Sequence, residues 1–202
     1  MLPADPEGEL TPMNYFTPDL FVRLQNLQDQ TSNEDWERAV EKYDDYLRSI
    51  RSRLPRSLRQ IVEEFYLHDA EVLCMSQRGK TLSVTLQLEP PAESLLVLNY
   101  SLLGDPEINR SALPAEYRAD YAAWLYDEVE VERPLPREAR QKGKKNGRAT
   151  DDRRVPVYSH KMLLSNGWEV SVRFRSLRLS RPKALIPGPG PEEAPLSVPR
   201  SA

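Results

Sequence analysis

Two histidines and one aspartate are the residues of this 202-residue chain whose types and spacing could support acid–base or metal chemistry. His68 and Asp69 are adjacent, and His160 is the only other histidine in the chain. Two histidines and one carboxylate can bind a divalent metal ion, and an aspartate that orients a histidine can serve in general acid–base catalysis. The sequence therefore offers one candidate metal or catalytic site, formed by these three residues.

A structural role explains the two adjacent residues without any chemistry. The apolar spacing of residues 58–65 predicts a helix, and an alternating pattern begins at Glu71. A histidine just beyond a helix end can donate to the last carbonyl groups, and an aspartate can accept from backbone N–H groups in the following turn. We therefore interpret His68 and Asp69 as a helix-to-strand joint, with side chains that hydrogen-bond to the backbone of residues 62–72.

The surroundings expected for His160 also weigh against a metal site. Asn166-Gly167 is a strong signal for a hairpin turn. A two-residue turn there would place His160 opposite Arg173, with Arg175 on the same face. Because neighbouring cations repel a divalent ion, we favour the structural interpretation of the histidines over catalysis or metal binding.

The chain contains none of the common sequence motifs for cofactor binding or catalysis. It has no GxxxxGK[ST], GxGxxG, GxSxG or HExxH sequence. Cys74 is the only cysteine, which excludes an internal disulfide and suits a reducing compartment. The N-terminus lacks the apolar region of a signal peptide, and no apolar run is long enough to span a membrane. We expect a cytoplasmic protein with no cofactor and no membrane partner.

Charge is distributed unevenly along the chain. Residues 1–132 contain 25 acidic and 12 basic side chains, whereas residues 133–183 contain 15 basic and 4 acidic ones. A basic surface could bind nucleic acid, but no aromatic–basic stacking motif accompanies it. We favour opposite charges that pair across neighbouring strands, with Glu128, Glu130 and Glu132 on the same sheet face as Arg173 and Arg175. The residues of the possible basic surface are Lys142, Lys144, Lys145, Arg148, Arg173 and Arg175.

Helical periodicity comes first along the chain and strand-like alternation comes second. Helix-start signals surround Pro18, and an amphipathic pattern extends over residues 36–54. Two hairpins are predicted around Gly79 and Asn166-Gly167, the first with Leu73 opposite Leu86, and two further strands lie within residues 94–103 and 122–132. The sequence therefore predicts an α+β fold, with N-terminal helices packed on an antiparallel sheet of about five to six strands built from hairpins.

Composition divides the chain into one domain and polar extensions. Residues 1–12 are expected to be a disordered and dispensable extension, so that either Met1 or Met13 could be the start. Residues 13–181 form the single domain, with a flexible basic loop at 133–154. Residues 182–202 are rich in proline and are expected to be a disordered tail.

Three stretches of the sequence resemble a family of uncharacterised bacterial proteins. They are the opener Tyr15-Phe16-Thr17-Pro18, the Leu67-His68-Asp69-Ala70 step and the late Ser165-Asn166-Gly167-Trp168-Glu169 hairpin. The resemblance extends over roughly residues 13–180. It implies a bacterial, cytoplasmic, single-domain protein and implies no activity.

These observations favour a protein that binds another protein and does not catalyse a reaction. An adaptor or immunity-like role suits a compact acidic domain without a catalytic motif, although the sequence does not identify the protein partner. One alternative is a nucleic-acid-associated protein that uses the basic 133–154 loop. Another is a metal-dependent enzyme that uses His68, Asp69 and His160.

Overall fold

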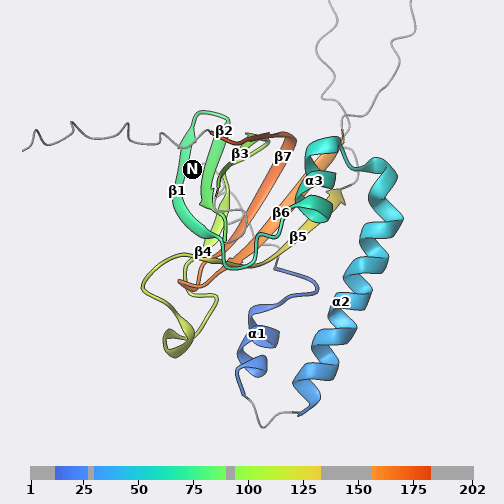
Figure 1. Cartoon of the computed structure of the whole chain (residues 1–202), viewed down its shortest axis with the longest axis vertical. Coiled ribbons are helices and arrows are strands. Elements are labelled where there is room, and N and C mark those ends of the chain that lie inside the picture. The colour runs from blue at the N-terminus through green and yellow to red at the C-terminus, as the bar shows by residue number, and fades with distance from the viewer. Residues whose placement is uncertain (1–11, 27–29, 90–93, 133–155, 183–202) are drawn as a thin grey trace, which may run out of the picture.

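The computed structural model describes residues 12–26, 30–89, 94–132 and 156–182 (Figure 1). The predictions for residues 1–11, the basic 133–154 loop and the tail after Pro182 lie outside the described residues. Within them the predicted α+β arrangement is confirmed, with helices first and an antiparallel sheet after them. No helix in the described part of the chain is both long and apolar enough to cross a membrane.

Three helices and a short 3-10 turn precede the sheet. Pro18 occupies the first position of its helix, and the Thr17 side chain accepts a hydrogen bond from the N–H of Leu20 at 3.2 Å, as an N-cap does. Pro55 directly precedes the third helix and so separates it from the second. The elements are α1 (Pro18–Leu24), α2 (Gln30–Ile50), the 3-10 turn η1 (Arg51–Arg53) and α3 (Arg56–Glu64).

The sheet has seven strands, one more than the upper expectation. The additional strand is β4 (Glu107–Asn109), a short strand that pairs with β7. A second 3-10 turn, η2, spans Ala115–Tyr117. The other strands are β1 (Glu71–Arg78), β2 (Thr81–Gln87), β3 (Leu95–Leu102), β5 (Trp124–Glu132), β6 (Val157–Leu164) and β7 (Glu169–Ser180), in the order β1-β2-β3-β7-β6-β5.

The sheet curls until the starts of its two outer strands meet. Glu71 and Ala123 form an antiparallel bridge. On one side of it the Asp69 N–H donates to the Trp124 carbonyl oxygen at 2.8 Å, and on the other the Val72 N–H donates to the Ala122 carbonyl oxygen at 2.8 Å. The segment between α3 and β1 is therefore tied by its backbone to the start of β5.

Each face of the sheet has its own hydrophobic cluster. The inner face, which carries Val84, Leu98 and Val172, packs with buried residues of α3 such as Leu58. The outer face packs on α1, α2 and the segment before α1, where Leu163 of β6 contributes a buried side chain. Strand β6 is buried along its whole length because both of its faces are covered.

The last hairpin has a three-residue loop and not the predicted two-residue turn. The Gly167 N–H donates to the Leu164 carbonyl oxygen at 2.9 Å, and the Leu164 N–H donates to the Trp168 carbonyl oxygen at 2.9 Å. Gly167 has φ +85°, as the last residue of such a loop requires. The predicted pairing of His160 with Arg173 is wrong, because this loop shifts the register by one residue.

That shift moves His160 to the other face of the sheet. His160 lies opposite Val172 on the inner face, whereas Arg173 lies opposite Ser159 on the outer face. The same shift places Tyr158 opposite Phe174 and not opposite Arg175. The argument that arginines surround His160 therefore does not hold.

The first hairpin follows the predicted register at its turn but not at its start. A bulge between Val72 and Cys74 places Val72, and not Leu73, opposite Leu86. Leu73 is 48% exposed as a result, and Cys74 is exposed as well. An extra residue in one strand shifts every earlier side chain to the other face, and alternation alone does not reveal it.

Helix α2 covers the free edge of β5. The N–H of Val129 donates to the Tyr43 hydroxyl oxygen at 2.6 Å, and the N–H of Val131 donates to the Tyr46 hydroxyl oxygen at 3.1 Å. An uncovered strand edge exposes unpaired backbone groups to other chains. These two hydroxyl groups satisfy that edge and fix α2 beside β5.

A buried carboxylate holds the segment that precedes α1. Glu128 has no exposed surface. Its oxygens accept the backbone N–H groups of Asn14, Tyr15 and Phe16 at 2.8, 2.6 and 2.7 Å. Burial raises the pKa of Glu128, although the three N–H groups and the nearby Lys161 oppose that shift.

Further ion pairs on the outer face support the same segment. Lys161, also buried, donates to Glu130 at 3.0 Å and to the carbonyl oxygen of Pro12 at 2.9 Å. Pro12 is exposed, but its carbonyl oxygen is thus bonded to the sheet one residue before the predicted boundary. Arg173 donates twice to Glu132, at 2.8 and 2.6 Å, which confirms the expected pairing for these two residues. Glu130 pairs with Lys161 and not with an arginine.

Replacement of Glu128 by glutamine should destabilise the fold. Either orientation of the amide would point its NH₂ group at a backbone N–H that now has an acceptor, so we expect a loss of about 1–3 kcal/mol in the free energy of unfolding. Urea unfolding measures the change. Glu41→Gln, at an exposed position of α2, is the control and should stay within about 0.5 kcal/mol of the parent. Equal stability of both variants would contradict the anchoring role of Glu128.

Candidate functional site

A chain of four polar side chains crosses the inner face of the sheet around His160. The His160 Nε2 atom lies 2.9 Å from Asp127 Oδ2, and its Nδ1 atom lies 2.9 Å from the Tyr100 hydroxyl oxygen. The indole N–H of Trp124 donates to the other oxygen of Asp127 at 2.9 Å. Strands β3, β5 and β6 supply these residues, so the sheet brings together positions that are far apart in the sequence.

This arrangement has the residue types of an acid–base relay but is closed to a substrate. Burial, together with the charge of Asp127, raises the pKa of Tyr100, which keeps its hydroxyl protonated as a donor. The network is satisfied if Nε2–H donates to the carboxylate and Nδ1 accepts from the tyrosine. Tyr100, His160 and Trp124 have no exposed surface, and only Asp127 is partly exposed, at 20%. The geometry therefore supports a role in holding the strands together.

The His68–Asp69 pair lies between α3 and β1, at the predicted position. The His68 Nδ1 atom lies 2.9 Å from Asp69 Oδ2, and the His68 ring stacks on Tyr66 with centroids 5.9 Å apart. The predicted side-chain hydrogen bonds to the backbone of residues 62–72 are wrong, since the described residues contain none. Backbone hydrogen bonds hold the joint, including the one from the Asp69 N–H to the Trp124 carbonyl oxygen. Asp69 adopts a left-handed conformation there, with φ +65°.

The structure does not assemble the metal site that the sequence offered. His160 has Asp127 as its carboxylate neighbour, and His68 has Asp69. Among the described residues, no group of three or more histidines, cysteines, aspartates or glutamates could hold a metal ion.

The basic surface is only partly described. Arg173 is engaged by Glu132, whereas Arg175 is exposed on β7. The other four candidates, Lys142, Lys144, Lys145 and Arg148, lie outside the described residues.

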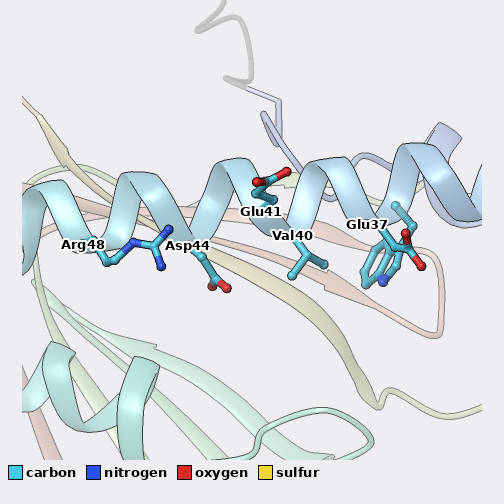
Figure 2. A pocket seen from close by; sticks show the side chains of 6 residues that line it. Glu37, Val40, Glu41, Asp44 and Arg48 are labelled. Atoms are coloured by element: carbon cyan, nitrogen blue, oxygen red, sulfur yellow. The ribbon is translucent and has the colours of Figure 1, made fainter.

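An open groove runs along one flank of α2 (Figure 2). Trp36 and Val40 provide apolar surface, and Glu37, Glu41 and Asp44 line it with carboxylates. Arg48 also lines the groove; it forms an ion pair with Asp45 and interacts electrostatically with Asp44 and Glu41. Among the described residues, no cation lies within ion-pair distance of Glu37, Glu41 or Asp44. The groove therefore combines apolar contact area with a net negative charge, since three carboxylates and one arginine line it.

A row of aromatic rings continues the groove towards the joint. The ring centroids of Trp36 and Tyr126 lie 4.6 Å apart, those of Tyr126 and His68 lie 5.4 Å apart, and Tyr66 follows His68. All four rings retain exposed surface, and Tyr66 is 74% exposed. Exposed aromatic rings beside an apolar groove are typical of protein-binding surfaces. We call this set the aromatic–acidic surface: Trp36, Glu37, Val40, Glu41, Asp44, Tyr66, His68 and Tyr126.

Sequence reasoning missed Tyr100 and Asp127, and it missed the aromatic–acidic surface. Strict alternation would place Trp124 on the same face as Glu128, but a bulge between Trp124 and Tyr126 shifts it to the inner face with Asp127. The spacing Trp124-x-x-Asp127 was the available signal for the buried network. Trp36 was read only as part of a helix face, because its neighbours in the row come from two other segments.

Comparison of the chain with protein-family models, with curated proteins and with solved structures found no match.

The left-handed backbone conformation of Asp69 should affect the stability of variants at this position. Asp69→Ala should lower the free energy of unfolding by about 1–2 kcal/mol, because φ +65° is unfavourable for a side chain that cannot bond locally. Asp69→Gly should recover most of that loss, although it also removes the carboxylate next to His68. Thermal unfolding compares the two variants. Equal losses would show that the His68–Asp69 contact, and not the backbone conformation, stabilises the joint.

The buried network should behave as one cooperative unit. Tyr100→Phe and His160→Leu should each destabilise the fold, because each leaves a buried polar partner without a hydrogen bond. The double variant should be more stable than the sum of the two losses implies, with a coupling of about 0.5–3 kcal/mol. Urea unfolding of the four proteins measures it, and Tyr100→Phe combined with the distant Glu41→Gln is the additive control. Strict additivity for Tyr100 and His160 would contradict the network.

Proposed function

We propose that this chain is a non-catalytic protein-binding protein, of the adaptor or immunity-like kind, and that its aromatic–acidic surface takes a basic segment of the partner. The observation that carries the proposal is the combination of partly exposed Trp36 and Tyr66 with three carboxylates that have no ion-pair partner among the described residues. The resemblance to uncharacterised bacterial proteins supports a bacterial and cytoplasmic setting for this role.

Energetics favour this surface over the buried network as the working site. Trp and Tyr are the residues most enriched at binding hot spots, where they fill desolvated contacts. Carboxylates around such rings attract a cationic partner and repel an anionic one, which affects both specificity and the association rate. A substrate could not reach His160, since its ring and that of Tyr100 have no exposed surface. A binding role thus accounts for the exposed aromatic rings and carboxylates, and a role in stability accounts for the buried network around His160.

The two alternatives have weaker support. The nucleic-acid alternative depends on residues that are outside the described part of the chain, and its best described candidate, Arg173, is neutralised by Glu132. The metal alternative would need His68, Asp69 and His160 to converge, whereas each histidine has a different carboxylate neighbour.

Charge reversal on the surface tests the proposal. The immobilised full chain and its Glu37→Lys/Glu41→Lys variant would be incubated with an extract of the cells that produce the protein, and retained proteins quantified by mass spectrometry. The control is Glu116→Lys/Asp120→Lys, which makes the same change in charge at exposed positions away from α2. We expect a partner that the control retains and the variant loses by about tenfold or more, because a like-charge contact costs several kcal/mol.

Two results would contradict the proposed function. One is a set of retained proteins that is the same for the parent and the charge-reversed variant. The other is nuclease-sensitive retention, which would favour the nucleic-acid alternative. A partner that is retained by the parent but lost equally by both variants would show a dependence on net charge and not on this surface.

A further inference from the structure

We infer that the aromatic–acidic surface binds a proline-rich segment that carries arginine or lysine, in the extended polyproline II conformation. This inference deepens the proposed function and rests on it, because it names the chemistry of the segment that the same surface takes. It adds a conformation and a residue type that a general basic partner does not require.

The first argument concerns hydrogen-bond donors along the row. The indole N–H of Trp36 and the hydroxyl groups of Tyr66 and Tyr126 have no hydrogen-bond partner among the described residues, and none of them is buried. Partial burial raises the pKa of Tyr126, so its hydroxyl remains a donor. A polyproline II segment makes no internal hydrogen bonds and presents all its carbonyl oxygens outward. The donors of the surface therefore match the carbonyl acceptors of a polyproline II segment.

The second argument concerns shape. Successive centroids in the row lie 4.6, 5.4 and 5.9 Å apart, so the rings form a narrow continuous strip. A polyproline II segment rises about 3.1 Å per residue, so roughly five or six residues would follow this strip. Proline rings pack on aromatic faces with little loss of conformational entropy, since the segment is already extended before it binds.

The third argument weighs the other common kinds of segment at this surface. An added β-strand needs a free sheet edge, and on β5, the strand that supplies Tyr126, the N–H groups of Val129 and Val131 are already bonded to Tyr43 and Tyr46. An amphipathic helix needs a wide apolar groove for positions i, i+3, i+4 and i+7, whereas the groove on α2 offers Trp36 as its only aromatic surface. A narrow strip with donors fits the extended segment better.

The fourth argument concerns charge. Glu37, Glu41 and Asp44 lie beside the strip, and Asp69, 61% exposed, lies at its other end next to His68. Arginine forms bidentate hydrogen bonds with carboxylates and also stacks on aromatic faces. A basic residue on either side of the prolines would therefore find a carboxylate, whereas the phosphates of nucleic acid would be repelled.

Calorimetric titration of the full chain with three ten-residue peptides tests the inference. The first peptide contains prolines interspersed with leucine and an arginine at each end. The second replaces the arginines with glutamate, and the third replaces the prolines with alanine. We expect the first peptide to bind at least tenfold more tightly than either of the others.

Protein variants locate the binding. Tyr66→Ala should weaken binding of the first peptide by about tenfold, and Glu41→Lys by more. Tyr121→Ala is the matched control, because Tyr121 is also an exposed tyrosine, at 61%, and has no ring contact with the row. Circular dichroism confirms that each variant is folded. If Tyr66→Ala and Tyr121→Ala change the affinity for the first peptide equally, the peptide does not bind at the aromatic–acidic surface.

The possible results separate this inference from the proposed function. Equal binding of the arginine–alanine peptide would overturn the polyproline inference and leave a basic-segment site in place. Equal binding of the proline–glutamate peptide would overturn the role of the carboxylates. If no peptide binds, the inference is wrong, and the extract experiment still decides the proposed function by itself.

Discussion

The contact of two tyrosine hydroxyl groups with the edge of β5 determines where the proposed binding surface lies. Tyr43 and Tyr46 accept the backbone N–H groups of Val129 and Val131, and α2 is thereby fixed along the strand that would otherwise be an open edge. Because the two tyrosines face the sheet, the residues on the outward side of the same helix, such as Glu41 and Asp44, face solvent. The groove on α2 is a consequence of how the sheet edge is covered.

The outer face of the sheet supports this arrangement through buried charge. Glu128 accepts three backbone N–H groups, and Lys161 connects Glu130 to the Pro12 carbonyl oxygen. A buried charge is costly unless it is paired and hydrogen-bonded, and here each charge holds the segment that leads into α1. Two basic residues from the second half of the chain, Lys161 and Arg173, pair on this face with glutamates of β5, while α2 keeps carboxylates for which the described residues offer no ion pair.

The fold class could be predicted from the sequence because periodicity and turn signals are local properties. The tip at Asn166-Gly167 was located correctly, but that dipeptide suits both two-residue and three-residue loops. A one-residue change in register moves every side chain to the opposite face, and so His160 was assigned the wrong neighbours. The bulges at Val72 and Trp124 had the same effect. The candidate site was harder still, because Trp36, Tyr126 and His68 come from three segments that only the tertiary structure brings together.

The indole N–H signals of the three tryptophans provide the most direct measurement of the central claim. In an NMR titration of the ¹⁵N-labelled chain with the arginine- and proline-containing peptide, Trp36 lies on the proposed surface, whereas Trp124 is buried and bonded to Asp127 and Trp168 lies beyond the last hairpin loop. The account predicts that the Trp36 signal shifts progressively and saturates while the other two signals stay in place. A titration in which Trp36 is unchanged, or in which Trp168 shifts in its place, would contradict the assignment of the binding surface.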